Sequence, residues 1–184
     1  MAARKTARAA LAELSGDAIM EKSRAVQALT LELEEFHSAK VVSLYCALVR
    51  EIRLDEIIAA CRAKNKIIVL PAWISARKSY GLARWDAGTP LKLGHYGIEE
   101  PAEPIWVPAT QVDFAVSTCL AFNAACQRLG HGGGYFDRLL AEVGGTKACL
   151  AFDCQKTDDI PLEPHDIQLD LVITESAIYR ALRT

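Results

Sequence analysis

The chain has 184 residues, of which 51% are hydrophobic, so it is long and apolar enough to bury one sizeable core. Its 21 basic and 23 acidic residues give a formal charge of −2, which excludes a broad electrostatic surface for DNA or RNA. No apolar run approaches the roughly 20 residues that a membrane-spanning helix needs, so we expect a single cytoplasmic domain over residues 1–184, with a monomer as the default state.

The N-terminal segment is predicted to be helical. Residues 2–13 are rich in Ala, Leu and Arg, and Ser15 or Asp17 could cap a second helix that runs to about Phe36. Apolar residues recur at helical spacing in this second helix, at Val26, Leu29, Leu33 and Phe36. We therefore expect residues 1–37 to form a helical arm that packs on a sheet.

Two β-rich runs flank a third predicted helix. Residues 41–48 and 66–73 are continuous apolar runs, as expected of strands that are buried on both faces. Residues 54–64 between them are amphipathic, and the order strand, helix, strand predicts a parallel βαβ unit. Residues 74–112 are rich in Gly, Pro and aromatic residues, and we expect a strand or hairpin with loops there.

The second half of the chain continues this alternation. Further strands are expected over 113–122, 147–154 and 169–175, and a short helix over 135–143. The predicted fold class is therefore α/β, a Rossmann-like single domain. It should contain an open, mostly parallel sheet of about five or six strands with helices on both faces.

The cysteines do not form a recognisable metal site. None belongs to a CxxC pair, and none lies at a zinc-like spacing from a histidine. Most lie in apolar runs, so we expect the buried, reduced thiols of a cytosolic protein. The residues are Cys46, Cys61, Cys119, Cys126, Cys149 and Cys154.

A glycine-rich loop is the most informative segment. Residues 128–138 read RLGHGGGYFDR, after a predicted buried strand and directly before a predicted helix. Ligands of open α/β sheets bind beyond the carboxyl ends of the strands. Glycines remove side chains, so backbone N–H groups can point together at an anion, and the following helix adds its positive end. These glycines are Gly130, Gly132, Gly133 and Gly134. The alternative is a flexible structural turn.

The loop is not a standard nucleotide motif. It lacks the Lys-Ser/Thr pair of a P-loop, and Tyr135 stands where the dinucleotide-binding pattern requires a third glycine. A nicotinamide cofactor is therefore disfavoured. Positive charge for an anion would come from Arg128, from Arg138 or from elsewhere in the chain.

The sequence RLGHGGGYFDR resembles the signature loop of the 5-formyltetrahydrofolate cyclo-ligase family, usually read RLGxGxGYYD. Other segments resemble the family more weakly but occur in its order. They are RKTAR from Arg4 to Arg8, Leu44 to Glu51, Leu70-Pro71, Gly97 to Pro101, and His165 to Asp170. The resemblance implies a fold that is broadly shared with the sugar-phosphate isomerase and deaminase superfamily.

The resemblance also implies a reaction. Family members use ATP and Mg²⁺ to close 5-formyltetrahydrofolate to 5,10-methenyltetrahydrofolate, and they release ADP and phosphate. The N5-formyl group is an amide, whose resonance is reflected in a rotational barrier of roughly 18–20 kcal/mol, and its oxygen is a poor leaving group. Phosphorylation of that oxygen would let N10 attack and phosphate depart. The implied partners are folate and ATP, without nucleic acid or membrane.

Site roles follow from the resemblance residue by residue. Arg128 and Tyr135 are the implied catalytic residues, Glu51 would accept hydrogen bonds from the pterin, and Asp137 and Asp170 are the implied Mg²⁺ positions. The implied ATP-binding set is Arg4, Lys5, Arg8, Arg128, Gly130, His131, Gly132, Gly133, Gly134, Tyr135 and Phe136. The implied folate-binding set is Cys46, Glu51, Tyr96, His131, Gly132, Gly133 and Tyr135. Each has an ordinary structural alternative; Asp137, for example, would suit the first turn of any helix.

Several positions depart from the family pattern. Asn123 stands where the family has Asp, Ser117-Thr118 replaces a Pro-Gly pair, Phe136 replaces a second Tyr, and Ala72 often has a basic counterpart. These changes fit a divergent enzyme. They also fit a non-catalytic or altered-specificity folate- or nucleotide-binding protein on the same scaffold. A sugar-phosphate isomerase is a weaker alternative that rests on fold analogy alone.

Overall fold

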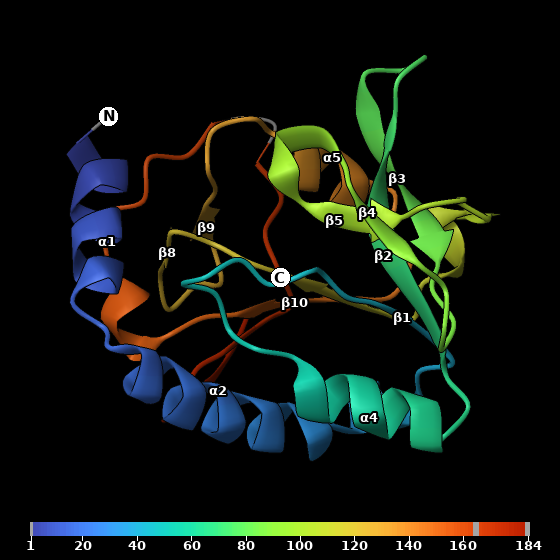
Figure 1. Ribbon diagram of the computed structural model, residues 1–184. Helices are drawn as coiled ribbons and strands as arrows, with labels where there is room; N and C mark the ends of the chain where they lie inside the picture. The colour runs from blue at the N-terminus through green and yellow to red at the C-terminus, as the bar shows by residue number, and fades with distance from the viewer. Residues whose placement is uncertain (1, 164–165, 183–184) are drawn as a thin grey trace.

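An eight-stranded mixed sheet forms the centre of the structure, a computed structural model that describes residues 2–163 and 166–182 (Figure 1). In spatial order its strands are β12 (Ile178–Arg180), β11 (Leu171–Ile173), β10 (Thr146–Leu150), β7 (Phe114–Ser117), β1 (Val41–Ser43), β2 (Ile67–Ile74), β3 (Ser79–Arg84) and β6 (Trp106–Val107). The five strands from β11 to β2 are parallel. Antiparallel strands extend both edges, so the sheet is larger than predicted.

Helices and two small hairpins surround this sheet. The helices are α1 (Ala2–Ala12), α2 (Gly16–Leu31), α3 (Glu34–Ser38), α4 (Asp55–Ala63) and α5 (Tyr135–Ala141), with 3-10 turns η1 (His95–Gly97), η2 (Ala109–Gln111) and η3 (Asp153–Gln155). One hairpin pairs β4 (Leu91–Leu93) with β5 (Glu99–Pro101), and the other pairs β8 (Ala121–Phe122) with β9 (Arg128–Leu129). Within the described part of the chain, no helix has the length and apolar character needed to cross a membrane.

Alternating side chains on the parallel strands enter two cores on opposite faces of the sheet. On β7, Phe114 and Val116 belong to the first core and Ala115 to the second. On β10, Leu150 belongs to the first core and Cys149 to the second. Helices α2 and α4 cover the first face and α5 covers the other (Figure 1). This double burial explains the continuous apolar runs, and it confirms the α/β prediction.

The N-terminal helices pack on the first core. Ser15 caps α2, because its Oγ accepts a hydrogen bond from the Ala18 amide at 3.1 Å. Ala7 and Leu11 of α1 are buried in the first core. The single helix expected to reach Phe36 is divided into α2 and α3, and extended backbone at Leu33 between them turns that side chain inward.

Four predicted strands are shorter than the runs that predicted them, and of the run 169–175 only Leu171–Ile173 joins the sheet. The run 113–122 leaves the sheet after Ser117 and continues into the β8–β9 hairpin, and the run 147–154 continues into η3. The run 41–48 leaves the sheet after Ser43, although the following Leu44 and Tyr45 stay buried. In this protein, a continuous apolar run in the sequence predicts which residues are buried more reliably than it predicts the length of the strand.

The strand order opens a crevice between β1 and β7. From β1 the chain crosses to β2 through α4 on the first face, whereas from β7 it reaches β10 through α5 on the second face. The connections after two neighbouring parallel strands therefore diverge at their carboxyl ends. Ligands of open α/β sheets bind at such a point. At the opposite, amino-terminal edge, Asp113 Oδ2 closes the gap by accepting from the Lys40 and Val41 amides, each at 2.8 Å.

Candidate active site

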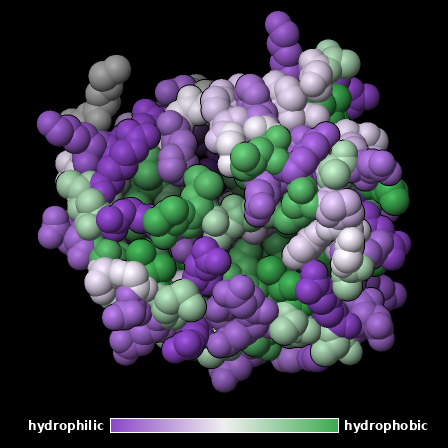
Figure 2. Space-filling model, in the orientation of Figure 1, coloured by the Kyte–Doolittle hydropathy of each residue, from purple (hydrophilic) through white to green (hydrophobic). Residues whose placement is uncertain are grey.

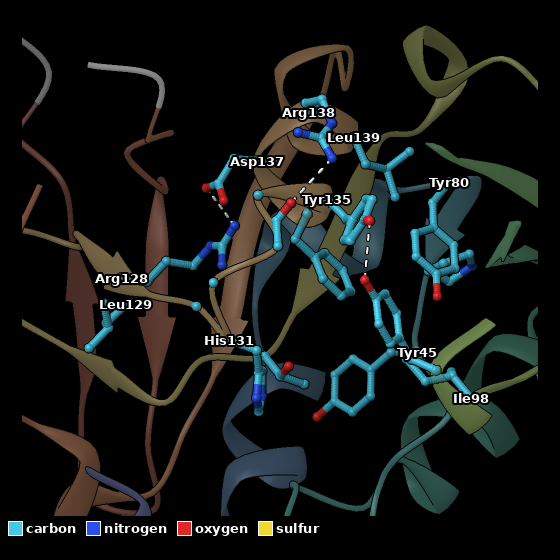
Figure 3. Close-up of a pocket in the computed structure, with 18 of the residues that line it drawn as sticks. Tyr45, Tyr80, Ile98, Arg128, Leu129, His131, Tyr135, Asp137, Arg138 and Leu139 are labelled. Atoms are coloured by element: carbon cyan, nitrogen blue, oxygen red, sulfur yellow. Dashed lines mark hydrogen bonds and ion pairs between the residues drawn. The ribbon is translucent and has the colours of Figure 1, made fainter. Parts of the chain in front are cut away.

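A cavity of about 720 Å³ lies at the carboxyl ends of β1 and β7. Its walls come from segments that are distant in sequence, chiefly the loop 45–51, Thr118, residues 96–99 and the segment 128–139. Arg4, Pro71, Tyr80, Pro161, Glu163 and Asp166 complete the lining. Figure 3 shows side chains from these segments pointing toward a shared space. On the face seen in Figure 2, hydrophobic residues gather inside a border of hydrophilic ones.

The glycine-rich loop lines this cavity with main-chain amides. Within the described part of the chain, no N–H of residues 130–134 donates to a protein acceptor. Two carbonyls of the loop are held by arginines: Arg4 Nε donates to the Gly130 oxygen at 3.1 Å, and Arg138 Nη2 donates to the Gly133 oxygen at 3.2 Å. Anchored carbonyls and available amides are the arrangement of an anion-binding concavity.

Glycine is required in this loop for backbone reasons. Gly132 and Gly134 have φ values of +106° and 61°, in the region that other residues rarely adopt. A Cβ atom on Gly133 would lie 2.6 Å from the Tyr135 ring. The glycines therefore keep the loop close to Tyr135 and leave its amides uncovered.

Arg128 supplies a buried positive charge in the cavity wall. Its side chain is 2% exposed, and its Nη2 donates to Asp137 Oδ1 at 2.7 Å (Figure 3). Its Nε is also buried and has no hydrogen-bond partner among the described residues. A buried donor without an acceptor is costly. The Arg128 guanidinium is therefore suited to an anionic ligand that would complete its hydrogen bonding.

Aromatic rings form another wall. The Tyr135 and Tyr96 hydroxyls are hydrogen-bonded at 3.2 Å, and the Tyr135 ring packs edge-on against Tyr80 at 5.7 Å between centroids. Trp73 packs against the same ring and stacks on His95 at 3.9 Å. Tyr96 has a φ of 59°, which is uncommon for a tyrosine, so the cluster holds this ring in a strained position. The wall offers flat faces to a planar ligand.

Glu51 lies where this cavity meets a second one of about 440 Å³. Its Oε2 accepts from the Leu48 amide at 2.9 Å, and the Thr118 hydroxyl also donates to it. Burial raises the pKa of Glu51, while these two hydrogen bonds act in the opposite direction. A poorly solvated carboxylate at the junction is suited to a ligand that presents N–H groups.

The second cavity lies between α1 and the loop after β1. Arg8, Leu11 and Arg50 line it, together with His131, which lines both cavities. Burial lowers the pKa of His131 below its ordinary value, and Arg8, Arg128 and Arg4 lower it further. The region around His131 is therefore strongly electropositive, as expected for the binding of a multiply charged anion.

Most of the predicted site residues meet at these cavities. The first cavity is lined by Arg4, Cys46, Glu51, Tyr96, Arg128 and all residues from 130 to 137, and Arg8 lines the second. Lys5 is exposed and lines neither cavity, which leaves Arg4 and Arg8 as the basic residues that α1 brings to the site. His165 lies outside the described residues.

Asp170, like Lys5, is a predicted site residue that lines neither cavity. Its Oδ2 accepts from the Lys147 amide at 2.8 Å and joins the amino-terminal starts of β10 and β11. The cavity lies at the carboxyl ends of the same sheet, so the geometry does not support a Mg²⁺ position at Asp170. Among the described residues, no three or more His, Cys, Asp and Glu side chains form a metal-binding group.

The sequence did not indicate the parts played by Thr118 and Tyr80 in the cavity wall, whereas Arg138 was already a candidate for positive charge beside the loop. Their contacts come from the folded chain: Thr118 reaches the cavity because β7 ends at Ser117, within the run 113–122 that was predicted as one strand. Asn123 lines neither cavity. Its Oδ1 accepts from the Ala125 and Gln127 amides, each at 3.1 Å, so it forms the β8–β9 turn.

A match to a family model shows how this chain is related to known proteins. The model of the 5-formyltetrahydrofolate cyclo-ligase family matches residues 1–175. The chain belongs to this family. A 5-formyltetrahydrofolate cyclo-ligase from Haemophilus influenzae is 31% identical over 159 residues, which cover 82% of this chain and 85% of that protein. One from Mycolicibacterium smegmatis is 34% identical over 128 residues, which cover 60% of this chain and 66% of that protein.

Solved structures agree with this assignment. The 5,10-methenyltetrahydrofolate synthetase from Aquifex aeolicus superposes with a TM-score of 0.86 at 30% identity, over 100% of this chain and 95% of that one. The synthetase from Mycoplasma pneumoniae has a TM-score of 0.76 at 23% identity, over 95% of this chain and 97% of that one, and supports the fold. Cyclo-ligases convert 5-formyltetrahydrofolate to methenyltetrahydrofolate, so the prediction of a ligase-family enzyme is confirmed.

Proposed function

We propose that this cyclo-ligase homologue closes 5-formyltetrahydrofolate to 5,10-methenyltetrahydrofolate with ATP and Mg²⁺, and that it releases ADP and phosphate. One observation carries the proposal. The available amides of residues 130–134 lie beside the buried Arg128 in a cavity that Glu51 also lines. Amides and guanidinium suit phosphate, and the carboxylate suits the amino group and ring N–H of a pterin.

The reaction has two steps. The formyl oxygen attacks the γ-phosphorus of ATP, ADP leaves, and the resulting phosphoryl-oxygen bond makes the formyl carbon electrophilic. N10 then attacks that carbon and loses its proton, and the carbon–oxygen bond breaks to release phosphate. Arg128 and the loop amides neutralise charge on the transferring phosphoryl oxygens, and Tyr135 orients the formyl group.

Two adjoining cavities suit two substrates that must react. We place the folate in the first cavity, with its rings against Tyr96 and Tyr135 and its pterin edge at Glu51. We place part of the nucleotide in the second cavity beside Arg8, with its phosphates where the cavities join at His131. Arg4 supports this placement because it holds the glycine-rich loop from α1.

Mg²⁺ is expected to enter with the nucleotide. This ion keeps several waters and is held by one or two carboxylates together with substrate phosphates, so a cluster of three protein ligands is not required. Asp137 lines the cavity beside Arg128 and is the residue that we expect to hold it. When bound, the ion would neutralise charge on the phosphates.

The positions that depart from the family pattern do not disrupt the proposed site. Asn123, Ser117 and Ala72 line neither cavity, whereas Thr118 and Phe136 do line the first. Thr118 donates a hydrogen bond to Glu51, and Phe136 keeps an aromatic ring 6.0 Å from the Arg128 guanidinium carbon. The departures therefore leave the proposed phosphate and pterin contacts in place.

The test is to mix the protein with 5-formyltetrahydrofolate, ATP and Mg²⁺ and to follow the absorbance of the methenyl product. We expect product only when all three are present. If no product forms while calorimetry still detects folate or nucleotide binding, the protein is the non-catalytic binding alternative. If neither ligand binds, the proposed site itself is wrong.

Replacing Asp170 by alanine is expected to destabilise the fold without changing metal use. The Lys147 amide would lose its acceptor, which should cost about 1–3 kcal/mol in urea unfolding. The Mg²⁺ concentration that gives half-maximal turnover should stay the same. Asp113→Ala is the matched control, since Asp113 accepts backbone amides at the same edge. A several-fold rise in required Mg²⁺ for Asp170→Ala alone would restore Asp170 as a metal position.

Nucleotide binding should take up a proton at about pH 6 and not at about pH 8. In the free protein, partial burial and the charges of Arg8, Arg128 and Arg4 lower the pKa of His131, which favours the neutral imidazole. A bound triphosphate would offset those charges and raise the pKa of His131. The affinity for nucleotide should therefore increase as the pH falls from the pKa of His131 in the bound protein to its lower pKa in the free protein. Calorimetry in two buffers of different ionisation enthalpy measures the uptake. His131→Gln should abolish it; unchanged uptake would assign the proton to another group.

A further inference from the structure

Helix α1 is attached by side-chain hydrogen bonds to both halves of the site. Near its start, Arg4 Nε donates to the Gly130 oxygen of the glycine-rich loop at 3.1 Å. At its other end, Arg50 Nη1 donates to the oxygen of Leu11 in the last turn at 2.8 Å and to the oxygen of Leu14, just beyond the helix, at 3.0 Å. The last carbonyls of a helix lack partners within the helix, and a cation beside them also complements the helix dipole.

Arg50 belongs to the loop that carries the folate-side carboxylate. It is followed directly by Glu51, whose Oε2 accepts from the Leu48 amide two residues before Arg50. Arg50 also lines the second cavity, opposite the helix that carries Arg8. The Arg50 guanidinium therefore links two parts of the site. One is the loop that carries Glu51, which we propose binds folate, and the other is helix α1, whose cations we propose bind the nucleotide.

We propose that Arg50 is a positioning residue that docks α1 so that Arg4 and Arg8 face the nucleotide. Its hydrogen bonds to the Leu11 and Leu14 carbonyls hold the end of α1 in place, and the helix in turn positions its two arginines. The docking of α1 by Arg50 is a property of the free protein and does not depend on any ligand. Only the statement that the ligand is ATP rests on the proposed function. The two parts can therefore fail separately.

The substitution Arg50→Met keeps the aliphatic stem and removes every donor. We expect faster amide hydrogen exchange over residues 3–12 in the free protein. We also expect a roughly five- to tenfold higher KM for ATP, with kcat and the KM for folate within about twofold, because positioning affects one ligand. Arg53→Met is the matched control from the same loop, since Arg53 lines neither cavity. Arg50→Lys, which keeps donors, should recover part of the loss.

A double-mutant cycle with Arg4→Met separates positioning from direct contact with ATP. If Arg50 acts by docking α1, the double variant should raise the KM for ATP about as much as the larger single effect. If Arg50 contacts the nucleotide directly, the two increases should multiply, and the proposal is overturned. Unchanged exchange over residues 3–12 in Arg50→Met would also overturn it. These exchange data remain decisive if the wild-type protein forms no methenyl product.

Discussion

Replacing Arg128 by methionine should lower kcat by about 10²–10³-fold, which is the usual cost of removing one group that stabilises developing charge. The Arg128 side chain is buried, donates to Asp137 and carries an Nε without a described partner. It therefore adds charge and a donor that need no rearrangement when a phosphoryl group is transferred. The rate of methenyl absorbance under saturating ATP and folate measures the loss.

The KM for folate should change by less than about threefold in the same variant, because Arg128 is assigned to the phosphates. Arg138→Met is a matched control: Arg138 also lines the cavity but is exposed, and its Nη2 is already used by the Gly133 carbonyl. Its kcat should fall far less. A decrease in kcat below about threefold for Arg128→Met would remove Arg128 from the mechanism.

Asp137→Ala should lower the free energy of unfolding by about 3–5 kcal/mol, because it leaves a buried guanidinium without its counter-charge. The two side chains are 2% and 12% exposed, so little solvent is available to compensate. Asp137→Ala should also weaken the use of Mg-ATP far more than the binding of folate. Urea unfolding measures the first effect, and titrations of turnover with Mg-ATP and folate measure the second.

The pair formed by Arg84 and Asp86 provides the control for Asp137→Ala. These side chains are 45% and 54% exposed, so Asp86→Ala should cost at most about 1 kcal/mol. A joint replacement, Arg128→Met with Asp137→Leu, should recover much of the lost stability while remaining inactive. Equal losses for Asp137→Ala and Asp86→Ala would show that burial does not strengthen the first pair. Equal weakening of ATP and folate use would contradict the role of Asp137 with the nucleotide.

The parallel core could be predicted from the sequence because its strands are long apolar runs. The segments around Val42, Ile68 and Phe114 are buried on both faces, so composition alone marks them. The shorter elements had no such signal. Strand β12 and the β8–β9 hairpin have two or three residues per strand, too few for a periodic pattern.

The candidate site could be predicted where one continuous segment forms it, and not where it depends on strand direction or on contacts between residues that are distant in sequence. The glycines and Tyr135 lie in one continuous segment whose chemistry can be inferred from the letters. Asp170 was misplaced because it begins a strand, and the start of a parallel strand lies at the far edge from the site. Arg50 follows no motif; its part depends on carbonyls almost 40 residues earlier in the chain.

The pairing of β1 with β7 also bears on how the protein folds. The Val41 amide bonds to Asp113 across 72 residues of sequence, so joining these strands requires closure of a long loop before any contact repays the entropy. The strand pair at the base of the crevice is therefore the pair in the sheet whose residues lie farthest apart in sequence. A substrate that spans the crevice binds only the completed assembly, and at a hundred times its Kd it would add about 2.7 kcal/mol to the native state.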